Sequence, residues 1–266
     1  MVVEQSRRAP GTAMTPFHIV IPARLGSTRL PRKILRQIAG RPMVQWTWDA
    51  AQAAGASAVI IATDTREVLD ACRAFGADVR MTDAAHQSGT DRVNEIAAQA
   101  GWSDDTLVVN LQGDEPLMPP AMIRDAARLL DGDARADIAT LCHPLHARED
   151  WLNPNFVKVV MDDAGHALYF SRAPIPWQRV GGSRESSLPE GLAFRHIGLY
   201  AYRVGALRRF SALPPSALEA CEALEQLRAL AHGLRIRVGV SASPPPRGVD
   251  TEDDLAAVSA IIASRS

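Results

Sequence analysis

Four cationic side chains crowd one short loop that follows the first apolar, strand-like run of the sequence. The segment from Pro22 to Lys33 also carries Arg24, Arg29 and Arg32. Guanidinium groups bind phosphate oxygens in pairs and a lysine adds a point charge, so the loop suits a triphosphate. A solvated basic loop without a ligand is the alternative, because surface charge is common. The position after a strand makes the two interpretations about equal, since ligands of open α/β sheets bind there.

Two acidic segments could supply the matching negative charge. The turn Gln112–Pro116 carries Asp114 directly after an apolar run, and a carboxylate there can hold Mg²⁺, a hard cation that bridges phosphates. The alternative is a turn whose acids cap a helix. The segment Gly248–Asp254 contains Asp250, but Thr251 and the neighbouring acids are also explained as a helix start. A metal role for Asp250 therefore needs support from elsewhere.

Other polar residues have ordinary structural explanations beside a functional one. The segment Ser88–Arg92 is typical of a capped helix start. His196 lies in an apolar strand pattern, where a single histidine is more often a satisfied core residue than a catalyst. Glu225 and Gln226 interrupt an otherwise amphipathic helix pattern. These residues alone leave their roles open.

Several classes of protein are disfavoured by motifs and composition. The sequence has no G-x-G-x-x-G after its first strand and no G-x-x-x-x-G-K-[ST], which argues against a dinucleotide dehydrogenase and a P-loop kinase. The formal charge of −1 argues against a dedicated nucleic-acid binder. The longest apolar run is about five residues, against roughly 20 for a membrane span. Three scattered cysteines suggest a reducing cytosol and neither a zinc site nor a disulfide scaffold.

The elements that must position these residues alternate between strand and helix. Strand patterns cover 17–21, 58–63, 78–81, 106–111, 137–143, 156–161, 167–170, 196–203 and 234–240. Helical patterns cover 43–54, 65–75, 90–100, 119–130, 204–211 and 216–232, with a last helix from about 251. This order predicts an α/β fold with a mostly parallel central sheet and helices on both faces. We expect residues 1–15 to form a flexible tail.

Nine motifs, taken in order, give the sequence a family resemblance. They are IPARLGSTRLPRK (21–33), ATD (62–64), HQSGTDR (86–92), VNLQGDEP (109–116), NPNFVKVV (153–160), ALYFSRAPIPW (167–177), RHIGLYAYR (195–203), LEQLRAL (224–230) and GVDTEDDL (248–255). No single motif is decisive, but the ordered set covers about residues 17–260. The chain resembles the 3-deoxy-manno-octulosonate cytidylyltransferase, or CMP-KDO synthetase, family.

The resemblance implies a reaction and a setting. Members transfer CMP from CTP to the anomeric 2-hydroxyl of 3-deoxy-D-manno-octulosonate (KDO), with Mg²⁺, and release pyrophosphate. The product serves lipopolysaccharide inner-core synthesis, which implies a Gram-negative cytoplasm. The family has a nucleotide-diphospho-sugar-transferase fold and is generally a homodimer, with no nucleic-acid partner and no membrane insertion. We therefore expect one domain over 16–264, with a nucleotide-binding part at about 16–135, a sugar-binding and dimerisation part at 136–235, and a return to the core at 236–264.

Residue roles carried over by matching motifs fall into three groups. Catalysis is assigned to Arg24, Lys33, Asp114 and Asp250, of which Asp114 and Asp250 would hold Mg²⁺. Nucleotide binding is assigned to Arg24, Arg29, Lys33, Ser88, Gly89, Arg92 and Gln112. Sugar binding is assigned to Arg172, His196, Tyr200, Glu225 and Gln226, with Arg172 suited to the sugar carboxylate.

Two rival functions stay open at this point. A CMP-acylneuraminate synthetase would run the same chemistry on a nine-carbon acid, although the motifs of the second half favour KDO. A nucleotide-binding regulator without turnover would keep the phosphate loop but would need neither Asp114 nor Asp250.

Overall fold

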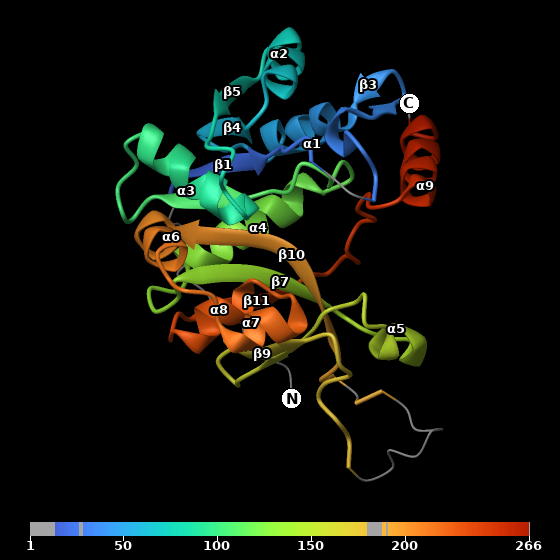
Figure 1. Cartoon of the computed structure of the whole chain (residues 1–266). Helices are drawn as coiled ribbons and strands as arrows, with labels where there is room; N and C mark the ends of the chain where they lie inside the picture. Colours follow the sequence, from blue (N-terminus) through green and yellow to red (C-terminus); the bar gives the residue numbers. More distant parts are fainter. Residues whose placement is uncertain (1–13, 27–28, 180–187, 190, 266) are drawn as a thin grey trace.

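The protein is built around one central sheet (Figure 1). The structure, a computed structural model, describes residues 14–26, 29–179, 188–189 and 191–265. The tail expected over 1–15 lies almost wholly outside the described residues. Within them, nine strands form the sheet, with β11-β7-β10-β6-β1-β4-β5 as its main path and β8 and β9 attached beside β10.

The elements alternate along the chain much as the sequence predicts. The strands are β1 (Phe17–Pro22), β2 (Gln37–Ile38), β3 (Arg41–Pro42), β4 (Ala58–Thr63), β5 (Asp78–Met81), β6 (Leu107–Asn110), β7 (Ile138–Pro144), β8 (Lys158–Met161), β9 (Ala167–Ser171), β10 (Phe194–Arg203) and β11 (Ile236–Val240). The helices are α1 (Met43–Gln52), α2 (Arg66–Ala74), α3 (Gly89–Gln99), α4 (Pro120–Asp131), α5 (Arg148–Leu152), α6 (Val204–Ser211), α7 (Ala217–Glu222), α8 (Gln226–Ala231), α9 (Glu252–Ala263) and the short 3-10 helix η1 (Lys33–Leu35).

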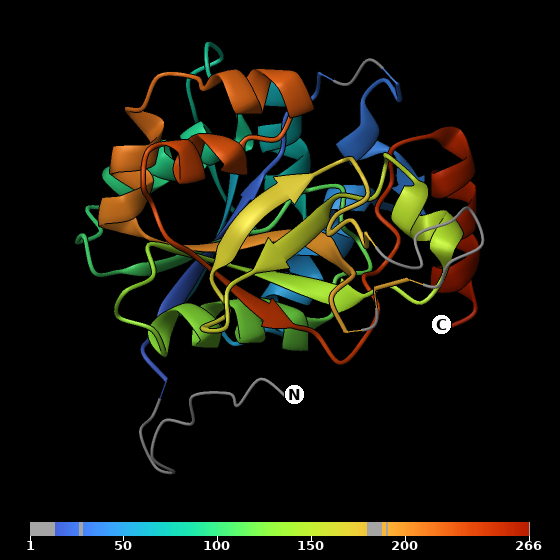
Figure 2. The same ribbon diagram turned by 90° about the horizontal axis from the view of Figure 1, so that it is seen from below.

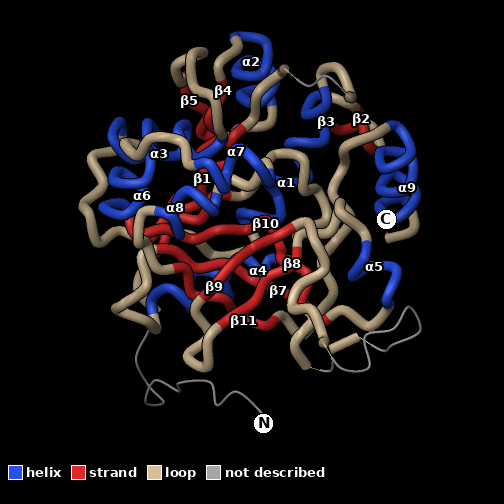
Figure 3. Tube along the Cα trace, turned by 60° about the horizontal axis from the view of Figure 1, so that its bottom comes forward, coloured by secondary structure: helices blue, strands red, loops and turns tan. Residues whose placement is uncertain are grey.

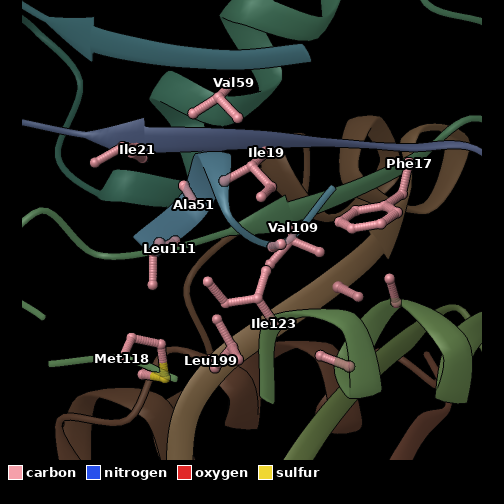
Figure 4. Packing of buried hydrophobic residues seen from close by; sticks show 14 of the residues in the cluster. Phe17, Ile19, Ile21, Ala51, Val59, Val109, Leu111, Met118, Ile123 and Leu199 are labelled. Atoms are coloured by element: carbon pink, nitrogen blue, oxygen red, sulfur yellow. The ribbon is translucent and has the colours of Figure 1, made fainter. Parts of the chain in front are cut away.

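Strand β1 explains why the sheet carries helices on both faces. It lies between β4 and β6, parallel to both, and is buried on its two sides. Side chains alternate along a strand, so Ile19 and Ile21 pack into a core with α1, α2 and α4 (Figure 4), while Val20 packs into a second core with α3, α6 and α8. Figure 2 shows α4 on one side of the sheet and α6 to α8 on the other. The predicted two-faced α/β architecture is confirmed.

The sheet is mostly parallel along its main path, as predicted. Strand β10 is antiparallel to both of its neighbours there, β7 and β6, whereas the other pairs on the path are parallel. The hairpin of β8 and β9 crosses in front of the sheet near α7 and α8 (Figure 3). This arrangement brings the second half of the chain against the ends of the first-half strands.

One predicted element is wrong. The pattern over 216–232 predicts a single helix, but the structure has α7 and α8, separated where Ala223 adopts a left-handed conformation with φ of 51°. A continuous helix would use the Glu222 carbonyl within its own ladder. Here that carbonyl instead accepts a hydrogen bond from the side chain of Arg172. A contact with a distant residue therefore overrides the local helical preference.

The last helix returns to the first half of the chain. α9 begins after Thr251, as predicted, and its apolar face packs with Ile38, Met43 and Val249 in a third, smaller core. The helix therefore fixes the segment just before it beside the loop that follows β1.

In the parts of the chain that the structure describes, we find no helix with both the length and the apolar character needed to cross a bilayer.

Candidate active site

The predicted chemistry-bearing loops meet at the carboxyl ends of β1, β4 and β6. The Ala23 amide donates to the carbonyl of Ala62 at 2.8 Å, and the Gly113 amide donates to the carbonyl of Pro22 at 3.3 Å. A β-carbon on Gly113 would lie 2.9 Å from that Pro22 oxygen, closer than real β-carbons approach. Glycine at 113 is therefore what allows the loop after β6 to touch the loop after β1.

Lys33 is the charge on which this site converges. Its Nζ donates to Asp114 Oδ2 at 2.5 Å and to Asp250 Oδ1 at 2.9 Å, and only 12% of the lysine side chain is exposed. Burial alone would lower the pKa of Lys33, but the attraction and hydrogen bonds of the two carboxylates outweigh it and raise the pKa. The lysine is therefore a firmly charged ammonium between two acids.

The structure shows which of the acids near the C-terminus cap α9 and which do not, a question that the sequence left open. Thr251 and Asp254 form a reciprocal capping box at the start of α9, and Glu252 pairs with Arg36. Asp250 does neither and turns to Lys33. Its position is fixed because the Val249 amide donates to the backbone carbonyl of Asp114 at 3.1 Å. Helix capping therefore does not account for Asp250.

The acidic turn after β6 also does not serve as a helix cap. α4 begins after Pro119, without a side-chain cap. Glu115, a residue to which the sequence assigned no role, lies against Gly248, where a β-carbon would be 2.9 Å from its Oε1. Burial, followed by the charges of Asp114 and Asp250, raises the pKa of Glu115 to about 8, against the opposing charges of Arg195 and Lys33. Glu115 therefore adds a third carboxyl group to the site, and burial is the main cause of its raised pKa.

The cations of the loop after β1 have different partners. Arg29 Nη2 lies 3.2 Å from Asp250 Oδ1, with both side chains largely exposed. Arg32 pairs with Glu67 of α2. Arg24 is exposed, and no described residue pairs with its guanidinium. Residues 27–28 of this loop lie outside the described residues.

Three of the predicted nucleotide residues, Ser88, Gly89 and Gln112, lie beside this loop, whereas Arg92 is buried. Ser88 caps α3, and a β-carbon on Gly89 would lie 3.3–3.4 Å from Pro22 and the side-chain oxygen of Gln112, so these segments adjoin. Arg92 differs, since its guanidinium is 2% exposed. It donates to Asp64 at 2.7 Å, to the Thr82 hydroxyl at 2.8 Å and to the Asp83 carbonyl at 3.1 Å. The structure gives Arg92 an internal role, and its contact with cytidine stays a prediction.

The predicted sugar residues are buried or half-buried, and two of them, His196 and Tyr200, are uncharged. His196 Nε2 lies 2.9 Å from the Thr140 hydroxyl, and burial lowers the pKa of His196 to about 3. Its ring packs edge-on against Phe170 and lies 5.4 Å from the ring of Tyr200. Burial raises the pKa of Tyr200 well above its ordinary value. These two side chains can therefore exchange hydrogen bonds with hydroxyls without carrying charge.

Glu225 links the predicted sugar residues to the start of α3, where the predicted nucleotide residues lie. The Thr90 hydroxyl on α3 donates to Glu225 Oε2 at 2.9 Å, across 135 residues of sequence. Gln226, next in the chain, is buried at the start of α8. Sequence patterns could not reveal this link, nor the partnership of Thr140 with His196, because each joins residues far apart. Arg172 lies against the junction of α7 and α8, where its guanidinium donates to the backbone carbonyls of Glu222 and Pro154.

The carboxylates suit a hard divalent cation. Asp114 and Asp250 already place oxygens around one positive charge, the Lys33 ammonium. Among the described residues, no cluster of three or more His, Cys, Asp or Glu side chains could hold a metal ion. Two protein carboxylates with the remaining ligands from phosphate and water is the usual arrangement for Mg²⁺. The donor set therefore fits the ion that the resemblance implies.

A parallel-sheet edge with a cationic loop opposed to two carboxylates is the arrangement expected of a nucleotidyltransferase. Comparison with known proteins agrees: residues 18–236 match the family model described as Cytidylyltransferase. Two curated relatives, from Thioalkalivibrio sulfidiphilus and Cellvibrio japonicus, are each 51% identical over 92% of this chain and 98% of their own, and both are named 3-deoxy-manno-octulosonate cytidylyltransferase. The chain belongs to the 3-deoxy-manno-octulosonate cytidylyltransferase family.

A solved structure supports the same conclusion. It is described as CMP:2-keto-3-deoxy-manno-octonic acid synthetase complexed with CTP. It is 40% identical to this chain, superposes with a TM-score of 0.86, and the match covers 95% of this chain and 100% of that one. The predicted family and fold class are confirmed, while the roles of the individual site residues stay predictions.

The internal role of Arg92 gives a direct test. Replacing it in Arg92→Met should lower the free energy of unfolding by about 3 kcal/mol, because Asp64 would be left without its buried partner. Urea denaturation followed by circular dichroism measures the change. The control Arg66→Met, which removes an exposed pair with Asp70 on α2, should cost less than about 0.5 kcal/mol. Equal stability of the two variants would contradict the internal role.

Proposed function

We propose that this chain is a 3-deoxy-manno-octulosonate cytidylyltransferase that transfers CMP from CTP to the anomeric 2-hydroxyl of KDO. The sugar hydroxyl attacks the α-phosphorus of CTP and loses its proton, the bond from that phosphorus to the oxygen bridging to the β-phosphate breaks, and CMP-KDO and pyrophosphate result. The observation that carries the proposal is the convergence of Lys33 with Asp114 and Asp250 at the sheet edge, in a chain that belongs to this family along nearly its whole length.

The cations of the loop after β1 bind and stabilise the triphosphate. Arg24, Arg29 and Lys33 supply donors for phosphate oxygens and for the charge that develops on departing pyrophosphate. Arg29 and Lys33 are paired with carboxylates in the ligand-free protein. Nucleotide binding therefore exchanges one set of anions for another around the same cations.

We propose Mg²⁺ as the cofactor, held by Asp114 and Asp250. When bound, the ion neutralises phosphate charge and lowers the pKa of a hydroxyl that it binds. The carboxylates of this chain would then give up Lys33, whose ammonium is freed to contact the phosphates. The contacts of Asp114 and Asp250 with the Lys33 ammonium support this proposal, because the two carboxylates already surround a cation.

The sugar pocket works by polar complementarity and not by acid–base chemistry of its histidine. His196 stays neutral because burial holds its pKa at about 3. It can therefore orient a hydroxyl but does not carry a proton to or from it near neutral pH. Tyr200, Glu225 and Gln226 add further polar groups. A pocket built from hydrogen-bonding groups rejects an analogue that lacks the matching hydroxyl.

We further propose that the enzyme is a cytoplasmic homodimer of a Gram-negative bacterium that supplies lipopolysaccharide inner-core synthesis. An apolar surface around α5 supports the dimer. Trp177 is 64% exposed and stacks on Trp151 of α5, with ring centroids 5.9 Å apart, and Leu152 of the same helix is 41% exposed. Exposed aromatic and aliphatic groups of this kind are typical of protein–protein contacts.

The reaction itself is tested by pyrophosphate release. We expect release with CTP, Mg²⁺ and KDO together and none above background when any one is omitted. A substrate panel separates the alternatives: faster release with an acylneuraminate than with KDO would contradict the choice of sugar. Release without added or bound divalent cation would contradict only the cofactor.

The carboxylates are tested by removing their charge. Asp114→Asn and Asp250→Asn should each lower kcat by at least about 100-fold, because charge stabilisation at the phosphates is lost. The control is Asp253→Asn, which removes an exposed acid three residues away and should leave kcat within about twofold. Near-normal turnover of both site variants would remove the metal proposal.

The dimer is tested by sedimentation. Trp177→Glu should convert a dimer into monomers, since a charge would be buried in the proposed contact. Analytical ultracentrifugation of the wild type and the variant measures the mass of each. Met81→Glu, which changes another exposed apolar residue on β5, should stay dimeric. A monomeric wild type at micromolar concentration would rule the dimer out.

A further inference from the structure

The guanidinium of Arg172 is oriented by backbone carbonyl groups. Its Nε donates to the carbonyl of Glu222 at 2.7 Å and its Nη1 to the carbonyl of Pro154 at 3.1 Å. Its Nη2 reaches the carbonyl of Ala223 at 3.5 Å. A guanidinium has five N–H donors, so these three contacts leave two, the number that a carboxylate accepts side by side.

The side chain of Glu222 holds the backbone of the same arginine. Glu222 Oε1 accepts from the Ser171 hydroxyl at 2.6 Å, and Oε2 accepts from the Arg172 amide at 2.9 Å. Ser171 is itself buried at the end of β9. Glu222 therefore grips Arg172 twice, through its carboxylate and through its own carbonyl.

A buried lysine fixes the opposite side of Arg172. Lys158 has no exposed surface, and its Nζ donates to the Arg172 carbonyl at 2.6 Å as well as to the carbonyls of Asn153 and Phe156. Burial lowers the pKa of Lys158, and the charge of Glu222 opposes that shift. The two peptide groups that flank the Arg172 α-carbon are thus held by groups of opposite charge.

Glu222 also ends α7 just before the segment that carries two other predicted sugar residues, Glu225 and Gln226. The left-handed Ala223 turns the chain, and Glu225 follows within three residues, where it accepts from Thr90 beside the nucleotide segment. The orientation of Arg172 and the start of α8 therefore depend on one junction.

We propose that Glu222 is a positioning residue for the acidic sugar: it sets the direction of Arg172 relative to Glu225 and so determines how tightly the sugar carboxylate is held. Glu222 need not touch the substrate. This inference rests on the proposed function, because it takes a sugar acid as the ligand of Arg172.

A double-mutant cycle tests the proposal with pyrophosphate release from CTP, Mg²⁺ and KDO. Glu222→Ala should lower kcat/KM for KDO by about tenfold or more while KM for CTP stays within about twofold. In an Arg172→Ala background, the same change should cost less than about twofold, because a residue that acts through Arg172 has nothing left to position. Glu222→Gln keeps an acceptor for the Arg172 amide and should restore kcat/KM to within about threefold of the wild type.

The matched control is Glu219→Ala on the same helix. Glu219 pairs with Arg228 and forms the capping box of α7 with Ser216, so its partners among the described residues differ from those of Glu222. It should destabilise α7 without selective loss of KDO. Should Glu222→Ala fail to fold, the cycle is run with Ser171→Ala, which removes one partner of the same carboxylate.

Additive losses in the cycle, or equal losses for CTP and KDO, would overturn the positioning role and leave Glu222 a stabilising residue. A Glu219→Ala variant with the same selective loss of KDO would do so too. A wild-type enzyme that releases no pyrophosphate with KDO would overturn the proposed function itself. Failure of the positioning role alone would appear only in the variants, measured against an active wild type.

Discussion

Two ionised carboxylates that lie close together in a partly buried site repel each other, so one of them takes up a proton unless a cation lies between them. The structure meets this constraint with Lys33, which binds both Asp114, 81 residues further along the chain, and Asp250, 217 residues further along. The lysine comes from the loop after β1, one acid from the turn after β6, and the other from the segment before α9. Three remote parts of the chain are therefore held together by one ammonium. Each of the three loops has to follow a path that places its charged group at this contact.

Close approach of the loops places demands on the backbone as well. Gly113 has to be glycine because the Pro22 carbonyl would lie 2.9 Å from a β-carbon, and Gly248 leaves room for the Glu115 carboxylate in the same way. The hydrogen bond from the Val249 amide to the Asp114 carbonyl then fixes the position of the neighbouring Asp250. Small residues and a main-chain contact therefore position the two acids around Lys33.

Local patterns predicted the elements well where local forces decide them. The β-branched run that became β4 was predicted at its observed bounds, because an apolar strand buried on both faces has few alternatives. The role of Asp250 could not be chosen locally, since Thr251 and the acids around it also describe a helix cap. The structure shows that Thr251 and Asp254 form the cap, whereas Asp250 pairs with Lys33. The broken helix at Ala223 was missed because its cause, Arg172, lies 51 residues away.

The predicted nucleotide and sugar parts prepare for their ligands by opposite means. In the nucleotide part, Asp114 and Asp250 neutralise Lys33 and Arg29, so the proposed triphosphate and metal would have to replace these contacts. In the sugar part a left-handed alanine costs roughly 1 kcal/mol, but it releases two carbonyls that orient Arg172 in advance. Binding of the triphosphate would therefore have to drive a rearrangement of ion pairs, whereas binding of the sugar would find Arg172 already oriented. A pocket oriented in advance discriminates between sugar acids, whereas exchangeable ion pairs allow pyrophosphate to leave.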